Sequence, residues 1–145
     1  MKVVLDAYAM VATLVGEPAG KTVVPYLPEA SISAGNLSEV MDVCVRVHGN
    51  PEGSVIEKID WLLAGGLDVI PIDVTLAIAA GALRARRYRK RECEISMGDC
   101  MAAALAASRR EPVATSDPHL ARASWAEGIE VLPLPDTRGR RPRRA

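Results

Sequence analysis

Short runs of β-branched and aliphatic residues alternate along this chain with longer segments whose apolar residues recur at helical spacing. The first short run is at residues 3–5, and a helical pattern begins directly after it at Asp6. Strands separated by helices are typical of parallel sheets, because a parallel connection needs a crossover of a dozen or more residues. The alternation therefore predicts an α/β fold with a central, mostly parallel β-sheet and helices on both faces.

The predicted elements cover most of the chain, and its 145 residues favour a single domain. We expect strands at residues 3–5, 31–33, 67–72, 112–115 and 130–134. We expect helices at residues 6–15, 21–27, 37–47, 74–90, 97–108 and 118–127, and one more from Pro51 to the Gly65-Gly66 pair, with an apolar stripe of Ile56, Ile59, Leu62 and Leu63. The domain should span residues 1–135, followed by a basic tail at 136–145 that we expect to be disordered.

Charge is unevenly distributed along the chain, although 18 basic residues balance 18 acidic ones. Residues 84–92 hold six basic groups and one acidic group, and residues 138–145 hold five arginines and no acid. Such blocks on an otherwise acidic chain indicate a polyanion that approaches at defined places. A solvated helix face, the acids of a partner protein and a solubilising tail are the alternatives. The candidates for contact with RNA phosphates are Arg84, Arg86, Arg87, Arg89, Lys90 and Arg91.

Composition excludes several classes of protein and site. The chain has no run of 18 apolar residues, so we expect no transmembrane helix and no membrane partner. Its three cysteines are too few and too scattered for a disulfide framework or a zinc site, which favours the cytoplasm. Aromatic residues make up 3% of the chain, so base stacking cannot dominate any nucleic-acid site.

Four carboxylates stand at the predicted starts of helices, behind predicted strands. Sites in parallel sheets form at the carboxyl ends of the strands, so we expect these side chains to meet at one edge. Each acid also has a purely structural explanation, since Asn36 to Glu39 and Ser96 to Asp99 have capping-box spacing and a proline follows Asp117. The four acids are Asp6, Glu39, Asp99 and Asp117.

Carboxylates crowded at one edge repel one another, by roughly 3 kcal/mol for a pair about 5 Å apart at an effective dielectric near 20. A divalent cation, or protonation of some of the acids, would relieve this repulsion. No His or Cys accompanies the acids at ligand spacing, and an all-oxygen site favours Mg²⁺ or Mn²⁺ over zinc. Together with the basic blocks, this predicts hydrolysis of a nucleic-acid phosphodiester by a metal-activated water.

Four segments of the chain carry a resemblance to a known family: KVVLDAYAMVATLVGEP, NLSEV, ISMGDCMAAALA and PVATSDPHL. In this order and spacing they resemble the acidic motifs of PIN-domain ribonucleases, and most closely those of the VapC toxins of toxin–antitoxin pairs. The resemblance covers essentially residues 1–135. It implies a PIN-like fold, endoribonuclease activity dependent on Mg²⁺ or Mn²⁺, restraint by a cognate VapB-like antitoxin protein, and a homodimer.

The resemblance also implies roles for individual residues. The acidic centre and metal ligands would be Asp6, Glu39, Asp99 and Asp117. Thr115 matches a hydroxyl residue that orients a water or a carboxylate, and Asn36 matches a polar residue before the second acid. Tyr8 departs from the pattern, because many relatives carry a small hydroxyl residue there.

Two alternatives to a nuclease follow from the same residues. The first is a catalytically silent PIN module that binds RNA or a partner protein, and the presence of all four acids argues against it. The second is an aspartyl-phosphate protein. A haloacid-dehalogenase-type phosphatase needs a second aspartate where Tyr8 stands, and a receiver domain needs an acidic pair at the end of its first strand, where this chain has only Asp6.

Overall fold

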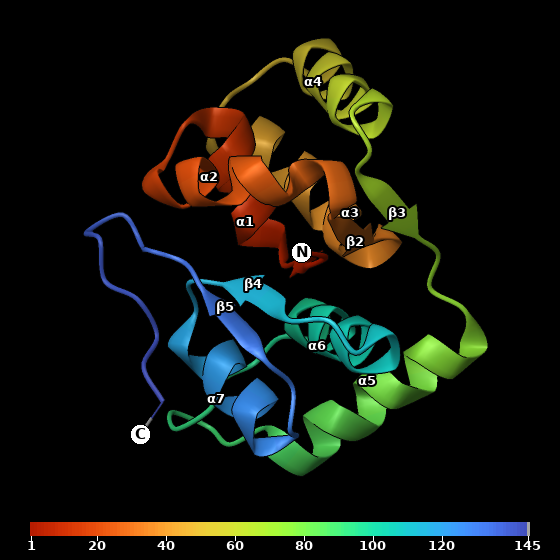
Figure 1. Ribbon diagram of the computed structural model, residues 1–145, viewed down its shortest axis with the longest axis vertical. Helices are drawn as coiled ribbons and strands as arrows, with labels where there is room; N and C mark the ends of the chain where they lie inside the picture. Colours follow the sequence, from red (N-terminus) through yellow and green to blue (C-terminus); the bar gives the residue numbers. More distant parts are fainter. Residues whose placement is uncertain (145) are drawn as a thin grey trace.

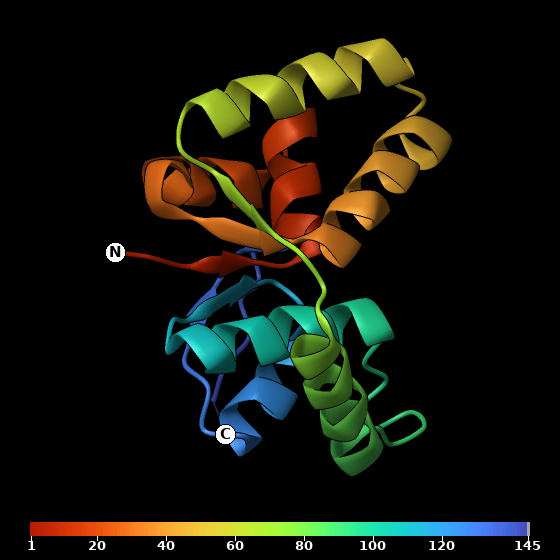
Figure 2. The same ribbon diagram turned by 90° about the vertical axis from the view of Figure 1, so that its right-hand side faces the viewer.

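The computed structural model of the protein describes residues 1–144, which are built around a single five-stranded sheet (Figures 1 and 2). The strand order is β3-β2-β1-β4-β5, and all four strand pairings are parallel. The predicted α/β class is therefore confirmed. The strands are β1 (Val4–Leu5), β2 (Ser31–Ser33), β3 (Asp68–Ile70), β4 (Val113–Thr115) and β5 (Val131–Pro133).

Helices cover both faces of the sheet, as expected. In Figure 2 the helices α1 to α4 lie above the sheet and α5 to α7 lie below it. Their bounds are α1 (Ala7–Val15), α2 (Pro18–Val23), α3 (Ala34–Asp42), α4 (Glu52–Ala64), α5 (Val74–Arg87), α6 (Met97–Arg109) and α7 (Pro118–Ala126). A 3₁₀ helix, η1 (Val24–Glu29), continues α2, and a π-helical turn, η2 (Val43–Val47), continues α3.

The side chains of each strand alternate between the two faces of the sheet, so the strands contribute to a hydrophobic cluster on each face. Leu5 of β1 and Ala114 of β4 belong to the cluster beneath α1 and α3. Val4 and Val113, one residue earlier in the same strands, belong to the cluster with α5, α6 and α7. The strands are thus buried on both faces, as in other parallel sheets.

The third helix begins three residues before its predicted start. Ser33 is its N-cap, with a hydroxyl oxygen that accepts a hydrogen bond from the Asn36 backbone N–H at 3.0 Å. The predicted capping box from Asn36 to Glu39 is therefore wrong, and Glu39 lies in the second helical turn. Ser33 takes the cap because it ends β2 in an extended conformation, which is the geometry an N-cap needs.

Two further expectations need correction. The helix predicted at residues 21–27 consists of the separate segments α2 and η1, and Pro25 and Pro28 lie within η1, where neither can donate a backbone hydrogen bond. In α4 the buried residues are Val55 and Ile59, whereas Ile56 and Leu63 of the predicted stripe are exposed. The apolar stripe of α4 is thus rotated by about one residue.

The C-terminal segment forms a turn around Asp136. The Asp136 carboxylate accepts hydrogen bonds from the backbone N–H groups of Arg138 and Arg140, at 2.8 and 2.9 Å. The Arg141 side chain donates to the Pro133 carbonyl at 2.6 Å. The disorder expected for residues 136–145 in solution stays a prediction. Among residues 1–144, no helix has the length and apolar character needed to cross a membrane.

Candidate active site

Asp6 lies at the carboxyl end of the central strand β1 and begins α1. Its Oδ1 atom accepts a hydrogen bond from the Ala9 backbone N–H at 2.7 Å, so it serves as the N-cap of the helix. Its own N–H donates to the Ala114 carbonyl of β4 at 3.3 Å. Only 4% of Asp6 is exposed, which is unusual for a carboxylate with no cationic partner among the described residues.

Asp99 and Asp117 stand at the starts of α6 and α7. Asp99 completes the predicted capping box, since its Oδ2 atom accepts from the Ser96 N–H at 2.8 Å and its N–H donates to the Ser96 hydroxyl at 3.0 Å. Asp117 accepts from the His119 N–H through Oδ1 at 2.8 Å. Each cap uses one carboxylate oxygen of its aspartate.

Thr115 joins two of these acids. Its Oγ1 atom accepts a hydrogen bond from the Asp117 N–H at 3.0 Å, and its hydroxyl lies close enough to the Asp6 carboxylate to lower the Asp6 pKa. Thr115 is the last residue of β4 and is fully buried, so both interactions form away from bulk water. The residue therefore lies between Asp6 and Asp117 and interacts with both.

Asn36 joins α3 to the start of α6 across the sheet edge. Its Nδ2 donates to the Gly98 carbonyl at 2.9 Å, and its Oδ1 accepts from the Ser33 hydroxyl at 2.5 Å. Asn36 is 1% exposed, and both of these bonds hold its amide in one orientation. It thereby brings Glu39, one helical turn further along α3, next to the residue that precedes Asp99.

Gly98 is the residue over which Glu39 lies. A Cβ atom built on Gly98 would overlap the Glu39 Oε1 atom, so the close approach depends on the absence of a side chain. The importance of Gly98 and of the Ser33 cap could not be recognised from sequence. The only local signal is a serine at the end of a predicted strand and a small residue before Asp99.

The electrostatics of the four acids link them as one group. Burial raises the pKa of Asp6 to about 7, hydrogen bonds from Thr115 and Ala9 oppose that rise, and the charges of Asp99 and Asp117 add to it. Burial, and the charge of Asp117, raise the pKa of Asp99. Burial, and the charge of Asp99, raise the pKa of Glu39. At the carboxyl edge of the sheet, each of the four predicted acids thus lies within electrostatic reach of at least one other.

The donor set fits a hard divalent cation in its chemistry. All the candidate ligands are carboxylate oxygens, and Mg²⁺ is commonly held by one or two carboxylates together with several waters. A bound cation would also offset the cost of ionising Asp6. Within residues 1–144, no three His, Cys, Asp or Glu side chains lie close enough together to enclose an ion as they stand. Water, substrate oxygens or small side-chain rotations would have to complete the coordination.

Half of the predicted RNA-binding block is engaged within the protein. Arg86 and Arg87 both pair with Glu127, at 2.5 and 2.6 Å, which ties the end of α5 to the end of α7. Arg84 donates to the Ile95 carbonyl at 3.0 Å and stacks over the Tyr88 ring. Arg89, Lys90 and Arg91 are exposed and make no ion pair within the described chain. RNA contact by the block stays a prediction.

Two neighbours of the acids have roles of their own. The Tyr8 hydroxyl donates to the Glu17 carboxylate rather than to any of the four acids. The Nδ1 atom of His119 accepts a hydrogen bond from the Glu94 N–H at 2.8 Å, which fixes the ring and anchors the 88–96 connection against α7. Neither side chain is therefore free to act as an additional metal ligand without breaking an existing contact.

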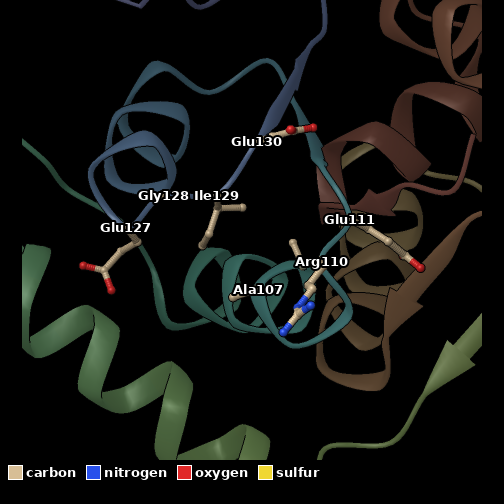
Figure 3. A pocket seen from close by; sticks show the side chains of 8 residues that line it. Ala107, Arg110, Glu111, Glu127, Gly128, Ile129 and Glu130 are labelled. Carbon is tan, nitrogen blue, oxygen red and sulfur yellow. The ribbon is translucent and has the colours of Figure 1, made fainter.

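A separate surface pocket lies at the opposite edge of the sheet (Figure 3). Its Glu111 and Glu130 precede β4 and β5, at the amino ends of the strands. Figure 3 shows the carboxylates of Glu111 and Glu127 pointing away from each other on either side of Arg110. No predicted site residue lines this pocket, and its charged groups do not converge on a common point.

Comparison with solved structures identifies several proteins of the same fold. VapBC2 from Rickettsia felis, solved bound to a promoter DNA fragment, is 15% identical over 91% of this chain and 98% of that one, with a TM-score of 0.69. VapC20 from Mycobacterium tuberculosis, a sarcin–ricin-loop-cleaving toxin, is 17% identical over 83% and 94%, with a TM-score of 0.68. FitAcB from Neisseria gonorrhoeae is 23% identical over 90% and 96%, with a TM-score of 0.64.

These identities are low, so the solved structures show a common fold and no more. A search of curated protein sequences found no match. The family model described as "PIN domain" matches residues 3–126, which include all four acids and both of their supporting residues, Asn36 and Thr115. The chain therefore belongs to the PIN domain family.

Proposed function

We propose that this protein is an endoribonuclease dependent on Mg²⁺ or Mn²⁺ and the toxin component of a type II toxin–antitoxin pair. The observation that carries the proposal is the meeting of Asp6, Asp99 and Asp117 at one sheet edge, where the buried Asp6 faces two like charges and has no ion-pair partner within residues 1–144. Such crowding of like charges raises the free energy of the folded protein, and a divalent cation would relieve it. Membership of the PIN domain family, whose members are typically nucleases, supports the same conclusion.

The chemistry would be divided between the ion and the side chains that hold it. Asp6, Asp99 and Asp117 would hold the ion, with Glu39 as a further carboxylate. When bound, Mg²⁺ supplies Lewis acidity toward water and the scissile phosphate. The Thr115 hydroxyl would orient the Asp6 carboxylate, and Asn36 would keep Glu39 next to Gly98, the residue before Asp99. With a pKa of about 7, Asp6 also holds a proton near neutral pH in the absence of a cation.

Partners follow from the same proposal. Solved neighbours include a toxin–antitoxin complex from Klebsiella pneumoniae and a DNA-bound VapBC complex from Salmonella typhimurium. By extension we propose a VapB-like antitoxin for this chain, a homodimeric toxin, and residence in the cytoplasm, where its three free, buried cysteines would stay reduced. Residues 1–135 would form the nuclease domain.

A catalytically silent PIN module is the second candidate. It is favoured by one observation, that no three ligand-type side chains within residues 1–144 are close enough to enclose an ion as they stand. A silent module would bind RNA or a partner protein without cleaving it, and addition of metal would leave the RNA intact.

A cleavage assay separates the two candidates. Metal-free protein is incubated with a single-stranded RNA transcript in EDTA, and then in excess Mg²⁺ or Mn²⁺. We expect cleavage only with the metal, and none from the variant Asp99→Asn. The matched control is Asp73→Asn, which alters the cap of α5 outside the acidic group. Intact RNA under all conditions would favour the silent module, and equal cleavage in EDTA would contradict the metal-dependent mechanism.

A further inference from the structure

The C-terminal arginine segment begins beside the acidic group. The Leu134 N–H donates to the Thr115 carbonyl at 2.9 Å, so the chain leaves β5 level with the residue that joins Asp6 to Asp117. Two residues later, Asp136 starts the turn that includes Arg138 and Arg140. Because β5 is parallel to β4, its carboxyl end lies at the same sheet edge as the acids.

Tyr8 provides an independent link between the turn and the acids. Burial of Tyr8 and its hydrogen bond to Glu17 raise the tyrosine pKa, and the negative charges of Asp136 and Asp6 both add to the rise. Tyr8 therefore lies within electrostatic reach of the Asp136 turn on one side and of Asp6 on the other. This agrees with the Leu134 to Thr115 hydrogen bond, which places the start of the turn near the acids.

Backbone N–H groups hold much of the turn, and the side chains of Arg138 and Arg140 are exposed. Asp136 accepts from the Arg138 and Arg140 N–H groups, and the Asp136 N–H donates to the Arg140 carbonyl at 2.8 Å. The guanidinium of Arg138 makes no ion pair within residues 1–144, and the guanidinium of Arg140 pairs with Asp136 at 2.9 Å while 71% of the Arg140 side chain is exposed. Arg86 and Arg87 of the other basic block share Glu127, and both side chains are less exposed than that of Arg140.

The far end of the segment lies away from the acids. Beyond the turn the chain runs back along β5, and Arg144 approaches Trp125 and Val131 at the amino end of that strand. Figure 1 shows this course, with the dark blue chain leaving β5, reversing in a loop and returning beside α7. The segment therefore has a proximal pair, Arg138 and Arg140, and a distal pair, Arg143 and Arg144.

We propose that the proximal pair, Arg138 and Arg140, binds the phosphate backbone of RNA at the mouth of the acidic site. This inference rests on the proposed function for its ligand class. Four carboxylates at one edge repel a polyanion, and two exposed guanidinium groups beside them offset that repulsion where the strand must enter. Arginine suits phosphate because its planar fork makes two parallel hydrogen bonds. Phosphate contacts position the strand and carry no base preference.

The test compares two double variants that remove the same charge from the same segment. Arg138→Gln/Arg140→Gln is measured against Arg143→Gln/Arg144→Gln, both in an Asp99→Asn background that cannot cleave. Binding of a fluorescein-labelled, mixed-sequence single-stranded RNA is followed by anisotropy over a range of monovalent salt in EDTA. Glutamine at position 140 keeps the backbone bonds of the turn, and circular dichroism and thermal unfolding check that each variant is folded.

The proximal variant should lose two phosphate contacts and the distal variant none. The log–log salt slope should then fall by roughly 1.4 for the proximal variant, which corresponds to about 25-fold weaker binding at 0.1 M salt. The distal variant should bind RNA within about twofold of the parent at the same salt concentration. Salt screens charges that make no direct contact with phosphate, so their removal changes the affinity little. Equal effects of the two pairs, or no effect of either, would overturn the proposal.

Two additional results keep this proposal separate from the proposed function. If the parent protein cleaves RNA with Mg²⁺ and the proximal variant binds RNA as tightly as the parent, the inference about the segment fails and the nuclease stands. If the proximal variant binds RNA weakly and the parent never cleaves, the nuclease fails and RNA binding by the segment stands. Competition by poly-L-glutamate as effective as that by RNA would indicate an acidic protein partner, and would also overturn the proposal.

Discussion

Replacement of Asp6 by asparagine should stabilise the metal-free protein at pH 8. The folded-state pKa of Asp6 is about 7, against an ordinary value of 3.8, so its ionisation opposes folding. The contribution of protonated Asp6 to the free energy of unfolding is fully present below pH 3.8 and is lost as the pH rises through about 7. The difference of about three pKa units corresponds to about 4 kcal/mol. For a domain of this size, that is a rise in Tm on the order of 10 °C.

The measurement is thermal unfolding of both proteins in EDTA at pH 8 and at pH 5. At pH 5 the advantage of Asp6→Asn should shrink to about 2 kcal/mol or less, because the native parent is already protonated there. Asparagine remains an effective N-cap for α1, so the substitution isolates the charge. The control Asp73→Asn changes the exposed cap of α5 and should show no such pH-dependent gain. A variant no more stable than the parent at pH 8 would refute the argument that Asp6 is a destabilising buried charge.

Three other predictions concern the supports of the acidic group. Gly98→Ala should displace Glu39 and lower the rate of RNA cleavage by about 10- to 100-fold, with little change in Tm. The control Gly81→Ala, whose new Cβ atom meets open space, should leave the rate unchanged. Equal cleavage by both variants would contradict the role of Gly98. Asn36→Ala should destabilise the fold by about 1–3 kcal/mol in urea unfolding, because it removes a buried bridge to the Gly98 carbonyl, and an unchanged midpoint would argue against that bridge. Thr115→Val should reduce the rise in Tm that Mg²⁺ produces more than it lowers the Tm of the metal-free protein. An equal loss of Tm with and without Mg²⁺ would mean that Thr115 acts only in packing.

Much of the fold could be predicted from local patterns. The five short apolar runs correspond to the five strands, and the helical spacing between them indicates the crossovers that a parallel sheet needs. The positions of Asp6, Asp99 and Asp117 follow from the same logic, because each comes directly after a strand or begins a helix. Local sequence was therefore enough to place three of the four acids.

The remaining features depend on contacts between distant parts of the chain. The start of α3 was misplaced because Ser33 and Asn36 both suit an N-cap, and only the bond from Asn36 to Gly98, 62 residues away, shows what Asn36 does instead. The arginines of α5 were predicted to face a polyanion, but Arg86 and Arg87 meet Glu127 of α7. No periodicity in the sequence encodes a pairing of that kind.

The central claim is that the four carboxylates form a divalent-cation site and are more than helix caps. The most direct test is titration of the metal-free protein with Mn²⁺, with free Mn²⁺ quantified by its electron paramagnetic resonance signal at pH 7.5. The account predicts saturable binding by the parent and by Asp73→Asn, and loss of that binding in Asp6→Asn and Asp99→Asn variants that remain folded. Equal Mn²⁺ binding by all four proteins, or none by the parent, would contradict it.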